Sequence, residues 1–100
     1  MIVYLAGKIT GEDEYREKFE RAEGTLMEHG HEVLNPATMP EGMTVRDYMA
    51  ICTAMLARAD AIALLPNWVN SRGAQIEKAL AEYMGLKVMY TGGKEDEGRP

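Results

Sequence analysis

The sequence has little cysteine, no surplus of positive charge and no long apolar segment, and each of these shortages excludes a class of protein. Cys52 is the only cysteine among 100 residues, so no disulfide can form within the chain. The 16 acidic residues outnumber the 11 basic ones, giving a net charge of -5, which argues against binding a nucleic-acid polymer through its phosphates. The apolar start, residues 1–6, is too short for a membrane span or a signal peptide. We therefore expect a cytoplasmic protein without membrane or nucleic-acid partners, in which a single small anion can still bind locally.

Length and periodicity predict the fold. A chain of 100 residues that are 46% hydrophobic supports one domain with a modest core. Apolar segments of strand length alternate with segments in which apolar residues recur at helical spacing, which favours a parallel sheet with crossover helices. The expected fold class is α/β: a small doubly wound parallel sheet, flavodoxin-like or Rossmann-like, of four to five strands with helices on both faces. The predicted strands are 2–6, 31–35, 61–65 and 87–91, the predicted helices are 12–29, 44–59 and 71–84, and a domain over 1–91 precedes a charged, flexible tail at 92–100.

One stretch, residues 64–77, gathers polar groups where a buried strand leads through a short loop into a helix. Open α/β folds bind their ligands at this carboxyl edge of the sheet. Glu77 falls on a helix face shared with apolar residues, where a carboxylate needs a partner or a task, although an acid near a helix start can also merely favour the helix dipole. Ser71 is either only the N-cap of that helix or also a phosphate ligand, and the two roles are compatible.

Two other features of this edge are open to two interpretations each. The loop Gly7-Lys8-Ile9-Thr10-Gly11 follows the first strand and suits close approach of an anion, but it lacks the dinucleotide and Walker patterns. Trp68 either stacks on a base or sugar, or simply covers the end of the sheet. The spacing of His, Cys and acidic residues resembles neither a zinc nor a calcium site, so we predict no metal and no cofactor.

Four stretches, taken in order, carry a resemblance to a known family. They are Tyr4-Leu5-Ala6-Gly7-Lys8-Ile9-Thr10-Gly11, His31-Glu32-Val33-Leu34-Asn35-Pro36, Asp60-Ala61 leading to Leu65-Pro66, and Ser71-Arg72-Gly73-Ala74-Gln75-Ile76-Glu77 with Ala81 and Gly85. The combination resembles the nucleoside 2-deoxyribosyltransferase superfamily, and most of all its branch of short bacterial and phage chains. The resemblance covers roughly residues 1–91.

The resemblance implies N-glycosidic bond chemistry on a nucleoside or nucleotide bound at the carboxyl edge of the sheet. A glutamate at the position of Glu77 would attack the anomeric carbon, as in retaining glycoside chemistry, and a tyrosine matching Tyr4 would orient it. Family members that act on nucleoside 5′-monophosphates have a serine where Ser71 stands, so the resemblance implies a monophosphate. Backbone amides near Gly73 and the loop from Gly7 to Gly11 would assist in holding the phosphate.

One position departs from the family pattern. Cys52 stands where the family carries a second aspartate, which leaves the acid/base half of the mechanism open because a neutral thiol does not replace a carboxylate in proton transfer. Two hypotheses follow: an N-glycosidase or deoxyribosyltransferase that acts on a nucleoside 5′-monophosphate, and a protein of the same fold that sequesters or senses a nucleotide without cleaving it. The resemblance also implies a homodimer or a higher even-numbered homo-oligomer, because small subunits of this family complete their sites across an interface.

Overall fold

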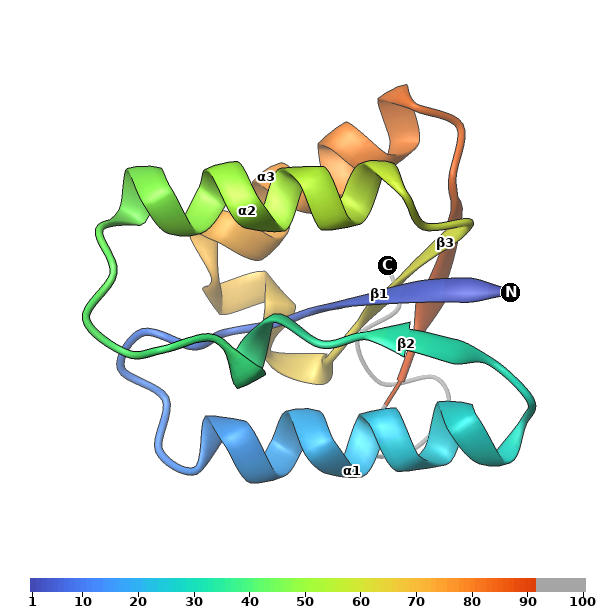
Figure 1. The fold of residues 1–100 in the computed structure, drawn as a ribbon, viewed down its shortest axis with the longest axis horizontal. Coiled ribbons are helices and arrows are strands. Elements are labelled where there is room, and N and C mark those ends of the chain that lie inside the picture. Colours follow the sequence, from blue (N-terminus) through green and yellow to red (C-terminus); the bar gives the residue numbers. More distant parts are fainter. Residues whose placement is uncertain (92–100) are drawn as a thin grey trace.

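The computed structural model describes residues 1–91, and the tail predicted at 92–100 lies outside the described residues. Four parallel strands form one sheet in the order β2-β1-β3-β4: β1 (Ile2–Ala6), β2 (Glu32–Leu34), β3 (Ala61–Leu64) and β4 (Lys87–Tyr90). Figure 1 shows α1 (Tyr15–Glu28) on one face of this sheet, and α2 (Val45–Ala57) and α3 (Arg72–Tyr83) on the other. The predicted doubly wound α/β fold is confirmed, with four strands in the sheet.

The two central strands, β1 and β3, divide the core into two halves. Successive side chains of a strand point to opposite faces of a sheet. On β1, Val3 and Leu5 pack with Phe19 of α1, whereas Tyr4 packs with Cys52 of α2 on the other face. Strand alternation therefore places the Tyr4 side chain beneath α2 and α3, on the face where the candidate site lies.

The order of the strands creates a crevice at one edge of the sheet. β2 lies beside one edge of β1 and β3 lies beside the other. The connections that follow β1 and β3 therefore run in opposite directions, and open α/β sheets bind their ligands between two such connections. These two loops are tied together, because the Lys8 amide donates to Asn67 Oδ1 at 3.0 Å. The segment after β3 is a 3₁₀ helix, η2 (Pro66–Asn70), and another, η1 (Pro36–Thr38), follows β2.

The helix boundaries differ from the predicted ones mainly at the start of α1. This helix begins at Tyr15 rather than at Glu12, because Glu14 adopts a left-handed conformation with φ of 57° that a right-handed helix does not contain. The acidic residues 12–14 therefore precede the helix instead of forming its first turn. Thr44 caps α2, since its Oγ1 accepts from the Asp47 amide at 3.1 Å. Within residues 1–91, no helix combines the length and the apolarity needed to cross a membrane.

Gly7 lies where the chain leaves β1 through a tight space, and replacing it should destabilise the fold. A Cβ at this position would lie 3.0 Å from both Leu65 Cβ and Asn67 Oδ1, and 3.3 Å from Phe19 Cζ. We expect Gly7→Ala to lower the free energy of unfolding by about 1–3 kcal/mol through this crowding. Urea denaturation measures the change.

Gly24→Ala is the matched control, because Gly24 lies inside α1 with open space around its Cα. Alanine there should raise the free energy of unfolding by roughly 0.5–1 kcal/mol through its better helix propensity. Equal effects of the two substitutions would contradict the close approach at Gly7.

Candidate active site

A buried hydrogen bond joins the central strand of the sheet to the third helix. Tyr4 Oη donates to Glu77 Oε2 at 2.7 Å, and the Glu77 side chain is only 5% exposed. Glu77 shares its helix face with the buried residues Ala74 and Ala81, which turn it toward the sheet and away from water. Glu77 is thus a buried acid with a partner, and not a solvated acid that merely favours the helix dipole.

Burial changes the acidity of both members of this pair. It raises the pKa of Glu77 to about 7, and the hydrogen bond from Tyr4 opposes part of the rise by stabilising the charged form. Burial and the neighbouring Glu77 charge raise the pKa of Tyr4 above its usual range. Tyr4 therefore remains a neutral donor, whereas Glu77 populates both the acid and the carboxylate near neutral pH. Perturbed acids of this kind, next to a cleft, are typical of catalytic sites.

Glu77 lines a cleft of about 510 Å³ at the carboxyl edge of the sheet. The walls come from the loop after β1, the first turns of α2, and the junction between η2 and α3. Tyr4 lies beneath this cleft and reaches it through Glu77. The structure brings together, in the lining of this one cleft, the predicted residues Gly7, Lys8, Ile9, Thr10, Ser71, Gly73 and Glu77.

The start of α3 gives part of this cleft the character of an anion site. Ser71 caps the helix, with its Oγ accepting from the Ala74 amide at 3.1 Å and donating to the Gly7 carbonyl oxygen at 3.5 Å. The side chains of Lys8 and Arg72 belong to the same lining. The first turn of a helix has amides without acceptors inside the helix and the positive end of the helix dipole. Two basic residues, a hydroxyl and a helix N-terminus thus belong to one part of the cleft lining, where a phosphate could bind.

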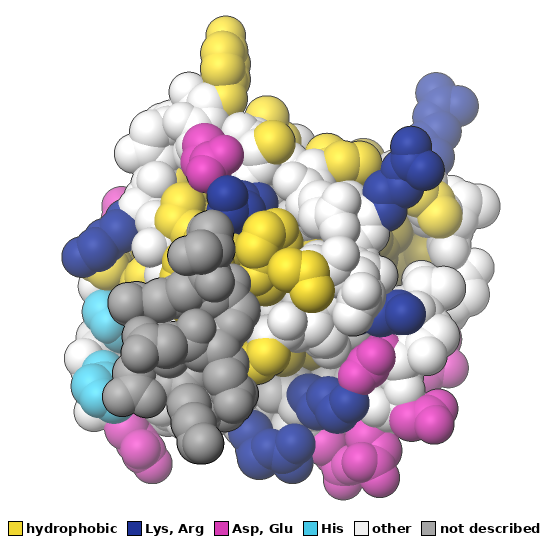
Figure 2. Space-filling model, turned by 180° about the vertical axis from the view of Figure 1, so that it is seen from behind, with side chains coloured by type: hydrophobic (Ala, Val, Ile, Leu, Met, Phe, Trp, Pro, Cys, Tyr) yellow, Lys and Arg dark blue, Asp and Glu magenta, His cyan; other side chains and the backbone are white. Residues whose placement is uncertain are grey.

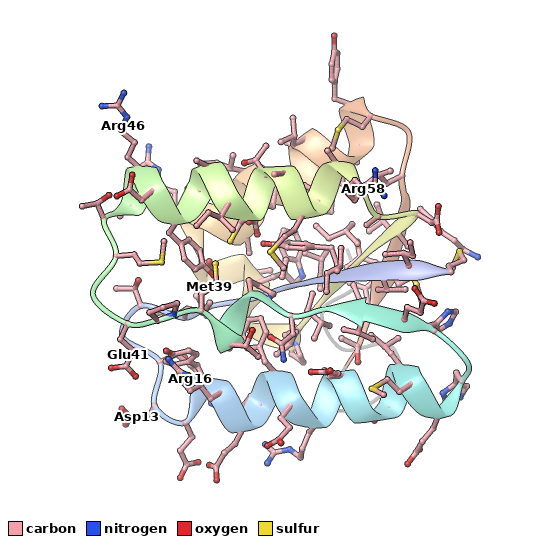
Figure 3. The ribbon with its side chains drawn as sticks, in the orientation of Figure 1. Asp13, Arg16, Met39, Glu41, Arg46 and Arg58 are labelled. Carbon is pink, nitrogen blue, oxygen red and sulfur yellow. The ribbon has the colours of Figure 1, made fainter. Side chains whose placement is uncertain are left out.

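A second cleft, of about 440 Å³, adjoins the first and extends it toward α1. Ile9, Thr10, Val45 and Tyr48 line both clefts and form the boundary between them. The segment 36–43 forms the far wall, and Arg16 anchors it: its Nη2 donates to the Met39 carbonyl oxygen at 3.0 Å and lies 3.6 Å from Glu41 Oε2. These side chains are labelled at the left of Figure 3, where Arg16 points from α1 toward Met39 and Glu41.

Charge is distributed unevenly along this edge of the molecule. Acidic residues line the second cleft, namely Glu12, Asp13 and Glu41, whereas the first cleft contains Lys8 and Arg72 in addition to Glu77. In Figure 2, seen from behind, acidic side chains gather at the lower right with basic ones beside them, and further basic side chains project at the upper right. A ligand with a negative end and a neutral end fits this polarity better than a uniformly anionic ligand.

Two predicted site residues lie elsewhere. Gly11 lines the second cleft, not the one that contains Glu77. Trp68 is absent from the lining of either cleft; its ring lies 6.4 Å from that of Tyr90, with Lys78 Nζ 5.4 Å from the Trp68 ring centroid. Trp68 also packs against the core cluster that contains Tyr4, so its position agrees with the interpretation that it covers the end of the sheet.

Several residues of the cleft were not predicted from the sequence, and Tyr48 and Arg72 are the two with the most evident chemistry. Tyr48 lies on the apolar stripe of α2, and periodicity alone assigns such a residue to the core; only the place of α2 beside the loop after β1 reveals its role. Arg72 follows the cap residue directly, so a cation next to a candidate phosphate ligand was the signal that could have found it.

Cys52, at the position where the resemblance implies an aspartate, is completely buried on α2. Burial raises the pKa of its thiol, while interactions with the hydroxyls of Tyr4 and Tyr48 oppose the rise. Cys52 is therefore a neutral thiol beneath the cleft, and no carboxylate replaces it at that position. Within residues 1–91, no three His, Cys, Asp or Glu side chains are grouped so that they could hold a metal ion.

Comparison with solved structures shows that two enzymes share the fold of this chain. A 2-deoxyribosyltransferase from Bacillus psychrosaccharolyticus superposes with a TM-score of 0.70 at 21% identity, covering 94% of this chain and 76% of that one. A CMP N-glycosidase from Clostridium botulinum superposes with a TM-score of 0.67 at 23% identity, covering 90% and 70%. The resemblance seen in the sequence is confirmed at the level of the fold.

The family of the chain is established by its sequence. Residues 1–90 match the model of a domain of unknown function, DUF4406, and the chain belongs to this family. A comparison with curated proteins gave no match.

Proposed function

We propose that this chain acts on the N-glycosidic bond of a nucleoside 5′-monophosphate, as an N-glycosidase or a deoxyribosyltransferase-like enzyme. The observation that carries the proposal is the buried Tyr4–Glu77 pair, whose carboxylate lines a cleft of about 510 Å³. A cleft of this size lies within the range of small-molecule sites. The fold supports the proposal, because it is shared with a 2-deoxyribosyltransferase and a CMP N-glycosidase.

In the proposed reaction, ionised Glu77 is the nucleophile and attacks the anomeric carbon of the sugar. The electron pair of the glycosidic bond leaves with the base, which takes up a proton from solvent. Water, or a second base in a transferase, then bonds to the same carbon, loses a proton and frees the Glu77 carboxylate. Attack removes a negative charge from a buried position, so the burial that raises the pKa of Glu77 also favours bond formation. Tyr4 is a positioning residue that holds one carboxylate oxygen.

The proposal assigns the substrate phosphate to the start of α3, beside Ser71, Lys8 and Arg72. Replacing Ser71 with alanine removes the hydroxyl from this position and also removes the helix cap. A lost hydrogen bond to a charged group corresponds to a rise of roughly ten- to hundredfold in the KM for the monophosphate. The KM for the matching free nucleoside should change little. Steady-state kinetics on the two substrates measures this difference.

Thr44→Ala is the matched control for Ser71→Ala. Thr44 caps α2 as Ser71 caps α3, with the same distance of 3.1 Å from hydroxyl oxygen to amide nitrogen, but it lines neither cleft. Each substitution should cost about 1 kcal/mol of unfolding free energy. Only Ser71→Ala should weaken monophosphate binding, and an equal effect on KM in both variants would contradict the phosphate assignment.

Release of free base is the direct test of the activity. The protein is incubated with a panel of ribonucleoside and deoxyribonucleoside 5′-monophosphates and the matching nucleosides, and chromatography quantifies the base. We expect release from at least one monophosphate, slower release from its nucleoside, and none from the Glu77→Ala variant. Release that survives Glu77→Ala would overturn the mechanism.

A second candidate function is nucleotide binding without cleavage, and Cys52 is the observation that favours it. The neutral thiol cannot transfer the proton that an aspartate would supply. This alternative predicts tight binding of a monophosphate, measured by calorimetry, together with no release of base over many hours. That combination of results would replace the enzymatic proposal with the binding one.

Assembly into a homodimer or a larger even-numbered oligomer is part of the proposal. Two apolar side chains at the cleft are strongly exposed in the single chain, Val45 at 78% and Ile76 at 52%. A second subunit that covers them would shield the cleft from water. Light scattering at micromolar concentration tests this, and a monomer would contradict it.

A further inference from the structure

Tyr48 lies at the candidate active site, but the proposed mechanism gives it no role. It lines both clefts, on the boundary between the one that contains Glu77 and the one beneath residues 36–43. Thr10 shares this boundary, but it belongs to an exposed loop, whereas Tyr48 is half-buried and packs against the core cluster that contains Tyr4 and Cys52. Of the two hydroxyl-bearing residues on the boundary, Tyr48 is thus the one that packing holds in place.

The surroundings of Tyr48 keep its hydroxyl protonated. Burial raises the pKa of Tyr48, and the neighbouring Cys52 and the charge of Glu77 raise it further. Cys52, one helical turn further along α2, interacts with the hydroxyls of both Tyr48 and Tyr4. Tyr48 is therefore a neutral hydrogen-bond donor in the lining of the cleft that also contains Glu77.

The arrangement of the two clefts determines which part of a bound nucleotide would lie next to Tyr48. In the proposed binding mode, the phosphate lies at the start of α3 and the anomeric carbon at Glu77, and both positions belong to the first cleft. A base that extends from there across the boundary would enter the second cleft, and the glycosidic bond would then lie beside Tyr48, which lines both clefts.

We propose that Tyr48 is a catalytic residue whose hydroxyl donates a hydrogen bond to the departing base at the boundary between the two clefts. This inference rests on the proposed function. When Glu77 bonds to the anomeric carbon, the electron pair of the glycosidic bond moves onto the base, and negative charge develops there. The phenol stabilises that charge without giving up its proton, and the base takes its proton from water. Tyr48 thereby supplies part of the leaving-group stabilisation that an acid at position 52 would provide.

The test compares Tyr48→Phe with the unaltered protein on two substrates that differ only in how readily the base leaves. The first is the monophosphate that the unaltered protein cleaves fastest, and the second is the same nucleotide with an electron-withdrawing fluorine on the base. Tyr48→Phe keeps the ring and its packing. It should lower kcat about 10- to 100-fold on the first substrate, the range expected for a hydrogen bond to a developing charge, with KM changed less than about threefold. On the fluorinated substrate the loss should be several-fold smaller.

Tyr83→Phe is the control, since Tyr83 is 88% exposed at the end of α3 and should leave both rates unchanged. A merely structural role for Tyr48 would lower both rates by the same factor, and that result would overturn the inference while leaving the proposed function intact. Full activity of Tyr48→Phe on both substrates would also overturn the inference and leave the proposed function intact. An unaltered protein that binds monophosphates and releases no base would overturn the proposed function and this inference together.

Discussion

Glu77→Gln should lower the rate of base release by at least about a thousandfold, because loss of a nucleophile removes the covalent route. Glutamine has nearly the shape of the acid and can still accept a hydrogen bond from Tyr4, so the fold and the cleft should persist. The rate is measured by chromatography of the base released under single-turnover conditions. Substrate binding, measured by calorimetry, should change much less than the rate.

Glu82→Gln is the matched control for this substitution. It removes a carboxylate from the same helix, but Glu82 lies on the exposed face and pairs with Lys78 at 2.9 Å. Its rate should stay within about twofold of the unaltered protein, as expected for an exposed ion pair. In the proposed mechanism only ionised Glu77 would attack, so kcat/KM of the unaltered protein should fall about tenfold per pH unit below pH 7. A Glu77→Gln variant with normal activity would exclude Glu77 as the nucleophile.

The same carboxyl group should make the stability of the fold fall as the pH rises. The pKa of Glu77 lies at about 7 in the folded chain, against an ordinary value of 4.5. The folded state therefore holds this proton more tightly than the unfolded state, and stability decreases from about pH 4.5 until the group is fully ionised just above pH 7. At about 1.4 kcal/mol per pH unit, this gap corresponds to roughly 3 kcal/mol.

Urea denaturation of the unaltered protein and of Glu77→Gln at a series of pH values measures this effect. Other groups titrate in both proteins, so the difference between the two stability curves isolates Glu77. We expect Glu77→Gln to be the more stable protein at pH 8, with its advantage shrinking toward pH 4.5. Parallel curves between pH 4.5 and 8 would show that burial does not raise the pKa of Glu77.

The sequence was sufficient to predict the strands and to place Glu77 on the apolar face of its helix, for a local reason. Runs such as residues 61–64 contain only apolar side chains, and Glu77 shares a helical spacing with Ala74 and Ala81. Both signals are periodicities that require no knowledge of distant contacts. The predicted order of strands and helices follows from the same signals and is confirmed.

Other features could not be predicted because they depend on contacts between distant segments. The late start of α1 results from the left-handed conformation of Glu14, which local propensity disfavours. Tyr48 has the helical spacing that a tyrosine of the core would also have. Its place in the cleft depends on the loop after β1, which lies beside it. Trp68 looks like a stacking residue in sequence, but its contacts with Tyr90 and Lys78 come from β4 and α3.

The Tyr4–Glu77 hydrogen bond also links activity to the completion of folding. Its two residues lie 73 positions apart, on the first strand and the last helix. Contacts of such long sequence separation require closure of nearly the whole chain, and they form late compared with local helices. A partly folded chain with a well-formed α1 or α2 would thus still lack the oriented carboxylate. Under the proposed function, catalytic competence would require α3 to be docked on the sheet, so a partly unfolded molecule would be inactive.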